Sequence, residues 1–95
     1  ARQLAADVQR GYLAYASAAR LVEVHEATRA LVDEQLRVAE RRVAAGSATP
    51  DAVLRARADR AEAAQAVTDA EAQREAARRA FNQLRGAPLE DAVPV

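Results

Sequence analysis

The residues that could carry out chemistry are few and scattered. The chain has one histidine, His25, and no cysteine. A Ser–His–Asp arrangement would need Ser17 or Ser47 together with an oriented carboxylate. Ser17 lies about two helical turns from His25, and Ser47 lies in a Gly-Ser-Ala-Thr-Pro segment with the composition of a turn. We therefore expect no enzymatic activity, and we interpret His25 as a polar interruption of a helix face.

The sequence also offers little to a metal ion or a cofactor. A metal site needs several histidines, cysteines or clustered carboxylates. Glu23, His25 and Glu26 lie close together in the chain, but positions 23 and 25 do not share a helix face. The sequence contains no glycine-rich loop of the kind that holds a phosphate. We expect neither a bound metal nor a cofactor.

Arginine supplies all fourteen basic residues, and fourteen acidic residues balance them to a net charge of zero. A nucleic-acid-binding protein usually carries a basic excess, so we expect no nucleic-acid partner. Three arginines, Arg29, Arg60 and Arg74, fall on apolar helix faces, as His25 does. We interpret these four residues as polar contacts between helices. The alternative is that the arginines contact partner chains in an assembly.

The elements that position these residues are predicted to be helices. Twenty-seven residues are alanine, and only Tyr12, Tyr15 and Phe81 are aromatic. Alanine has the highest helix propensity, and a chain rich in alanine, arginine and glutamate is typical of long helices or coiled coils. We predict an all-α fold in which residues 1–95 form one coiled-coil hairpin of two long antiparallel helices. Its parts are a helix over about 1–45, a tip at 46–50, a helix over about 50–85 and a non-helical tail at 86–95.

Stop and start signals define the predicted hairpin. Gly46 suits the left-handed position just past a helix end. Thr49 is a good N-cap, Pro50 is favoured at the first helical position, and Asp51 complements the helix dipole. A connection this short makes the two helices antiparallel neighbours. Gly86 and Pro88 then end the second helix.

Two stripes of small and apolar residues run along each predicted helix. In the first helix, the residues at 3–4 spacing that we call its seam are Val8, Gly11, Tyr15, Ala18, Val22, His25, Arg29, Val32, Leu36, Ala39 and Val43. Its second stripe is Leu13, Ser17, Leu21, Val24, Thr28, Leu31, Gln35 and Val38. In the second helix, the seam is Val53, Ala56, Arg60, Ala63, Val67, Ala70, Arg74, Ala77, Phe81 and Leu84, and the second stripe is Leu54, Ala58, Ala61, Gln65, Thr68, Ala72, Ala76 and Ala80. One seam serves a hairpin, so a second stripe predicts further helical neighbours. Asp33 and Arg37, which belong to neither stripe of the first helix, have the spacing of an i,i+4 ion pair.

No apolar run approaches the roughly 18 residues that span a bilayer, so we do not expect this chain itself to cross a membrane. The helical pattern is already running at Ala1, which is not a methionine. We therefore expect the chain to be part of a longer protein.

The segment from Arg42 to Ala56 resembles the hairpin tip of TolC-type outer-membrane efflux proteins. That family typically reads Arg, three residues, Gly, a turn of small residues, then Asp-Val-Leu-x-Ala. The residues that fall in step are Arg42, Gly46, Asp51, Leu54 and Ala56. The stretch Asn82-Gln83-Leu84-Arg85-Gly86-Ala87-Pro88 is similar to the family's Asn-x-Leu…Gly-x-Pro end of the helix, and Val8 to Tyr12 is similar to its Val-x-x-x-Tyr start. Ala52, where the family usually has valine, and Arg85, where it has an apolar residue, depart from the pattern.

The resemblance implies a function. Members of this family are trimers with an outer-membrane β-barrel and a periplasmic tunnel of helices, closed so that every helix has a neighbour on each side. Their hairpin tips meet a periplasmic adaptor protein, which links the channel to an inner-membrane pump. Carried over to this chain, the adaptor-docking residues are Arg42, Gly46, Ser47, Ala48, Thr49, Pro50 and Asp51. The chain would then be the periplasmic portion of an outer-membrane protein.

Two other interpretations stay open at this point. The first is a structural or oligomerising coiled coil with no transport role. The second is the helical hairpin of the adaptor protein itself, for which Ala87-Pro88 would be the return from the hairpin. Adaptor hairpins usually place an Arg-Leu motif just before the tip, whereas this chain has Arg42-Val43 followed by two alanines.

Overall fold

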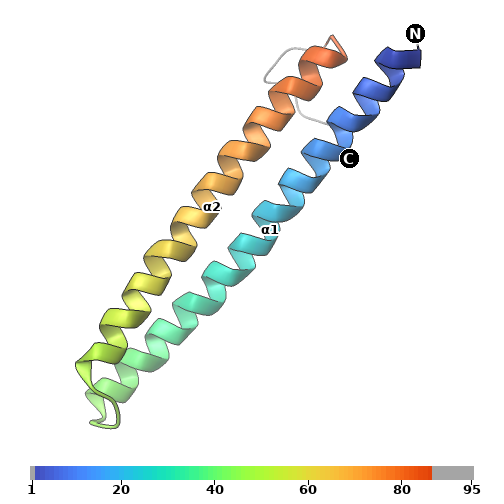
Figure 1. Ribbon diagram of the computed structural model, residues 1–95. Helices are drawn as coiled ribbons and strands as arrows, with labels where there is room; N and C mark the ends of the chain where they lie inside the picture. The colour runs from blue at the N-terminus through green and yellow to red at the C-terminus, as the bar shows by residue number, and fades with distance from the viewer. Residues whose placement is uncertain (1, 87–95) are drawn as a thin grey trace. The chain divides into compact units, whose positions relative to one another are not determined.

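The computed structural model describes the backbone of residues 2–86 and the side chains of residues 6–86. Two helices, α1 (Arg2–Ala44) and α2 (Pro50–Leu84), account for nearly all of this part of the chain, and it contains no strand. A turn at residues 45–49 joins the helices into an antiparallel hairpin, as Figure 1 shows. The predicted all-α hairpin is therefore confirmed. The predicted tail lies outside the described residues except for Gly86, which is part of a turn.

Contacts between residues divide the hairpin into two compact units. The tip unit is Glu23–Thr68, and the end unit combines Ala1–Val22 with Asp69–Val95. Each unit pairs a segment of α1 with a segment of α2. The sequence alone predicts one hairpin and gives no sign of this division.

A Schellman motif ends α1, because Gly46 adopts a positive φ of 76°. The Gly46 N–H donates to the Val43 carbonyl at 3.0 Å, and the Ser47 N–H donates to the Arg42 carbonyl at 2.8 Å. These are the two reverse bonds that satisfy the last carbonyls of a helix. Gly86 plays the same role after α2, with φ 73° and a bond from its N–H to the Gln83 carbonyl. Both glycine stop signals in the sequence are thereby confirmed.

The core of the end unit consists of Val22, Ala70, Phe81 and Asn82. Phe81 is buried, and its ring meets the Tyr12 ring edge-on with 5.9 Å between the centroids. The Arg85 guanidinium lies 5.3 Å from the Phe81 centroid, within cation–π range. Gly11 lets α2 approach closely, because an added Cβ would make contacts tighter than usual. A Cβ there would lie 3.0 Å from a Leu84 methyl carbon and 3.2 Å from the Phe81 ring.

The core of the tip unit is smaller and aliphatic. Leu36 of α1 and Ala63 and Val67 of α2 are buried, and all three lie on the predicted seams. Small residues on a seam let two helix axes approach closely. The hydrophobic contribution to stability scales with the apolar area buried. Because these buried side chains are few and mostly small, that contribution is small in this unit.

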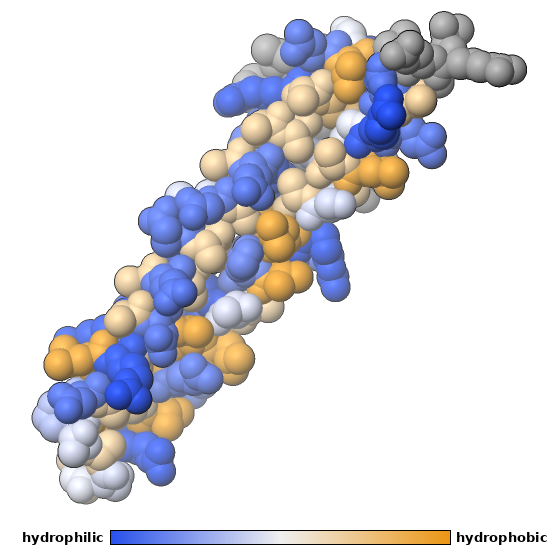
Figure 2. Space-filling model, in the orientation of Figure 1, coloured by the Kyte–Doolittle hydropathy of each residue, from blue (hydrophilic) through white to orange (hydrophobic). Residues whose placement is uncertain are grey.

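The two stripes of each helix differ in burial, as the sequence pattern predicts. Nearly all seam residues with described side chains are buried or half-buried, whereas every residue of both second stripes is exposed. The most exposed large side chains are Leu54 at 61%, Leu31 at 59% and Leu13 at 56%. Figure 2 shows such apolar side chains on the surface between hydrophilic ones. None of the described helices combines the length and apolarity needed to cross a membrane.

Candidate partner-docking site at the hairpin tip

The sequence-predicted docking residues form a continuous, mostly exposed surface at the turn. Arg42, Gly46, Ser47, Thr49, Pro50 and Asp51 are exposed, and Ala48 is half-buried. The Ser47 hydroxyl donates to the Arg42 carbonyl at 3.1 Å, which adds to the bond from its own N–H. Thr49 occupies the N-cap position of α2, and its carbonyl accepts from the Ala52 N–H at 3.0 Å. The tip is thus a tightly bonded turn that presents small side chains and two charges.

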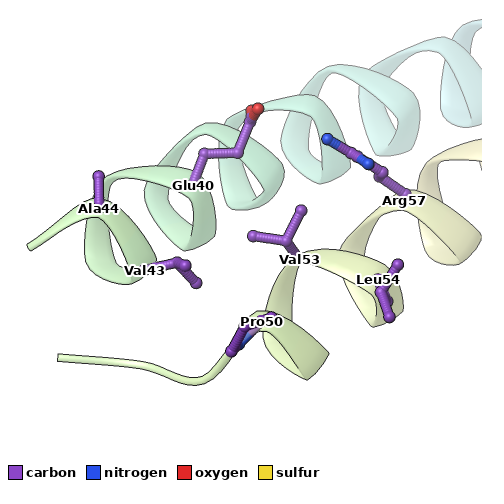
Figure 3. Close-up of a pocket in the computed structure, with 7 residues that line it drawn as sticks. All are labelled: Glu40, Val43, Ala44, Pro50, Val53, Leu54 and Arg57. Atoms are coloured by element: carbon purple, nitrogen blue, oxygen red, sulfur yellow. The ribbon is translucent and has the colours of Figure 1, made fainter. Parts of the chain in front are cut away.

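A groove lies directly behind the turn, within the tip unit (Figure 3). Its volume is about 460 Å³. The apolar lining comes from both helices and consists of Val43, Ala44, Pro50, Val53 and Leu54. Glu40 and Arg57 stand on its rim. A groove with an apolar floor and one charge of each sign on its rim suits an amphipathic segment of another protein better than a small ionic ligand.

An ion-pair cluster on α1 lies about one to three turns before the tip. Arg37 donates to Glu34 Oε2 through Nε at 3.0 Å and through its terminal nitrogen at 2.8 Å. Arg41 lies 3.7 Å from the other Glu34 oxygen. The hydrogen bond from Arg37, reinforced by the charges of Arg37 and Arg41, holds the pKa of Glu34 below its ordinary value. The same hydrogen bond raises the pKa of Arg37. Because the cluster is exposed, we expect it to contribute little to stability.

His25 borders a second, smaller hollow in the tip unit. Thr28 and Val32 line it from α1, and Asp59, Glu62, Ala63 and Ala66 line it from α2. His25 therefore faces the partner helix, where we expected a polar contact. Among the residues that the structure describes, no group of three or more metal-ligating side chains comes together.

The structure gives the three seam arginines different surroundings. Arg60 reaches across the tip unit, where its Nε lies 2.9 Å from Asp33 Oδ1. That oxygen has no hydrogen-bond partner, so the contact is an ion pair without hydrogen-bond alignment. Arg74 in the end unit approaches Glu75 of its own helix at 4.0 Å. Arg29 is half-buried on α1.

Sequence reasoning assigned Asp33 a different partner. The i,i+4 spacing predicts an Asp33–Arg37 pair, but the structure pairs Asp33 with Arg60 and Arg37 with Glu34. Sequence reasoning also missed the groove residues Glu40 and Arg57. Each lies within two turns of the Gly46–Pro50 break, but the sequence alone does not show that they flank one groove, because they come from different helices.

Comparisons of the chain with models of protein families, with curated proteins and with solved structures gave no match.

Proposed function

We propose that this chain is the periplasmic helical hairpin of an outer-membrane efflux or secretion channel. In this proposal, hairpins of a homo-oligomer pack side by side as the wall of a tunnel. The tip, from Arg42 to Asp51, docks on a periplasmic adaptor that connects the channel to an inner-membrane pump. Transport is passive conduction through the tunnel, so no residue of the chain needs to perform catalysis.

The observation that carries the proposal is the exposure of the second stripes. Leu31 and Leu54 are each more than half exposed, and the α1 stripe continues with exposed leucines and valines at regular helical spacing. Exposed apolar residues in a continuous pattern mark interaction surfaces. A hairpin with one buried seam and one exposed stripe on each helix has the surfaces that a wall of helices requires.

The tip supplies the second line of support. Its turn is held by three bonds to the Arg42 and Val43 carbonyls, one of them from the Ser47 hydroxyl, and the residues from Gly46 to Pro50 are exposed except for the half-buried Ala48. The groove behind the turn adds an apolar floor. A well-defined protrusion beside a groove suits docking with another helical hairpin.

A structural coiled coil is the second candidate, because the same exposed stripes would serve any lateral assembly of helices. The two functions differ at the tip. A channel hairpin needs a partner there, whereas a structural coiled coil does not.

A cross-link at the tip tests the proposal. Ser47→Cys is introduced into the protein as cells express it, with any other cysteine replaced, and is labelled with a thiol-reactive photo-cross-linker. Ala30→Cys, an exposed position on α1 away from both the tip and the second stripe, is the matched control. The proposal predicts an adduct between position 47 and a periplasmic adaptor and none from position 30. Adducts only with the same protein, or none despite good expression, would favour the structural coiled coil.

A further inference from the structure

Three arginines beside the turn lack the carboxylate neighbours that other arginines of this chain have. Carboxylate oxygens lie within 4.0 Å of Arg10, Arg37, Arg41, Arg60, Arg74 and Arg78. In the part of the chain that the structure describes, the guanidinium groups of Arg42, Arg55 and Arg57 make neither an ion pair nor a hydrogen bond, and all three residues are exposed. Among the other arginines with described side chains, only the half-buried Arg29 also lacks such a contact.

The charges of the tip unit are unevenly distributed. Residues 40–57 hold four arginines and two carboxylates, whereas the rest of Glu23–Thr68 holds three arginines and six carboxylates. The tip is therefore basic and the rest of its unit is acidic, although the chain as a whole has no net charge. A basic surface of this kind attracts acidic partners.

The helix dipoles explain only part of this pattern. Arg42 lies in the last turn of α1, where a cation complements the negative end of the dipole. Arg55 and Arg57 lie in the second turn of α2, near the end where the dipole favours anions. The dipole of α2 therefore gives no reason for two arginines at these positions, and a partner's carboxylates would.

The three arginines project from different sides of the tip. Because successive residues of a helix are turned by about 100°, Arg55 and Arg57 lie about 200° apart around α2, on nearly opposite sides. Arg57 stands on the rim of the groove behind the turn, as does Glu40 (Figure 3). Arg42 lies about 200° from Glu40 around α1 and so faces away from that groove. A flat surface could meet only one of these sides, whereas a socket that surrounds the tip could meet both.

We propose that the tip fits into a socket of another protein whose walls carry carboxylates, and that Arg42, Arg55 and Arg57 recognise those carboxylates. A guanidinium can bind a carboxylate through two parallel hydrogen bonds, which fixes orientation as well as charge. The inference rests on the proposed function for the place of docking, and it adds the chemistry and the shape of the partner surface.

A protein socket fits these observations better than a membrane or a nucleic acid. Glu40 and Asp51 lie among the arginines, and each would repel a polyanion. The turn at residues 45–49 consists of alanine, glycine, serine and threonine, so it has no large apolar side chain to insert into a lipid surface.

Titration of the 95-residue chain with poly-L-glutamate, followed by NMR, tests the charge preference of the tip. Poly-L-lysine is the oppositely charged probe, and phosphatidylglycerol vesicles are the membrane probe. The proposal predicts amide shifts at residues 40–57 with polyglutamate and none there with polylysine. Because exposed charge pairs contribute little each, we expect roughly tenfold weaker binding in the triple variant Arg42→Gln, Arg55→Gln, Arg57→Gln.

A matched control removes the same charge from exposed positions of the end unit, as Arg10→Gln, Arg20→Gln, Arg79→Gln. This control should respond to polyglutamate at residues 40–57 as the wild type does. An equal response of the tip to both polymers, an equal loss in both triple variants, or binding to vesicles without binding to polyglutamate would overturn the proposal.

Charge reversal in cells tests the socket itself. Arg42→Glu, Arg55→Glu and Arg57→Glu are each combined with Ser47→Cys and its photo-cross-linker, with Arg10→Glu as the control. A surrounding socket predicts that each reversal at the tip lowers the adduct yield several-fold at equal expression, and that the control does not. An adaptor adduct that resists all three reversals, or falls with only one, would overturn the inference and leave the proposed function intact. If Ser47→Cys alone gives no adduct, the proposed function fails, and the polyglutamate titration still decides the inference.

Discussion

Gly46 is the residue on which the turn depends most. Its φ of 76° lies in the left-handed region, and a Cβ added there would meet nothing within 4 Å. The cost of Gly46→Ala is therefore conformational, and we expect a loss of about 1–2 kcal/mol in the free energy of unfolding. Urea unfolding followed by circular dichroism measures it. Gly46→Asn should lose less, because asparagine tolerates this conformation. Equal stability of the alanine variant and the wild type would contradict the assigned role of Gly46.

Glu34 is the residue whose titration reports on the α1 ion-pair cluster. Its pKa is lowered, chiefly by the Arg37 hydrogen bond. A carboxylate with a lowered pKa in the folded state stabilises that state above its ordinary pKa, and the contribution is lost as pH falls through the lowered value. We expect Arg37→Gln to move the Glu34 pKa back up toward its ordinary value in an NMR titration. Arg55→Gln, which changes an exposed arginine outside the cluster, should leave it in place. A Glu34 pKa that does not respond to Arg37→Gln would rule out this cause.

At the scale of the helices, Phe81 is the largest of the buried side chains in the described part of the end unit. Phe81 is buried against Tyr12 and lies under Arg85. Replacing a buried phenylalanine by alanine typically costs about 3–5 kcal/mol. We expect Phe81→Ala to remove hydrogen-exchange protection from amides of the end unit first. Phe81→Leu, which keeps most of the apolar volume, should cost less. Loss of protection in the tip unit alone would contradict this account of the core.

The sequence predicts the helices well and their ion pairs less well. The expected ends at about 45 and 50 agree with Ala44 and Pro50, because Gly46 and Thr49-Pro50 act locally through backbone conformation. The two stripes follow from helical periodicity, which is also local. The pairing of Asp33 with Arg60 depends on the level of α2 against α1. That level is set by the turn geometry and the packing of both helices, and no spacing within one helix encodes it.

The candidate site, too, could be predicted from the sequence only in part. The docking residues of the turn follow directly from its glycine, threonine and proline. The groove behind it does not, because Glu40 and Arg57 come from different helices and flank an apolar floor only once the hairpin has closed. The partner at the tip is a proposal from resemblance and shape, and the cross-link from position 47 tests it.

At the scale of the whole molecule, the account requires the chain to associate with other helices. Leu31 and Leu54 leave apolar surface in water at sites where the helices need no exposed leucine for their own stability. Covering such surface contributes about 25 cal/mol for each Å² removed from water. We expect the double variant Leu31→Gln, Leu54→Gln to weaken association without lowering helix content, because leucine and glutamine are both good helix formers. A drop in helix content of the isolated double variant would show that the leucines support the hairpin itself.

Sedimentation equilibrium of the 95-residue chain over a wide concentration range tests the central claim most directly. The claim is that the second stripes are interfaces for neighbouring helices. The account predicts a mass that rises above that of a 10.2 kDa monomer as concentration increases, and a smaller rise for the Leu31→Gln, Leu54→Gln variant. A strictly monomeric chain at the highest concentrations would contradict it, because the exposed stripes would then have no affinity for one another.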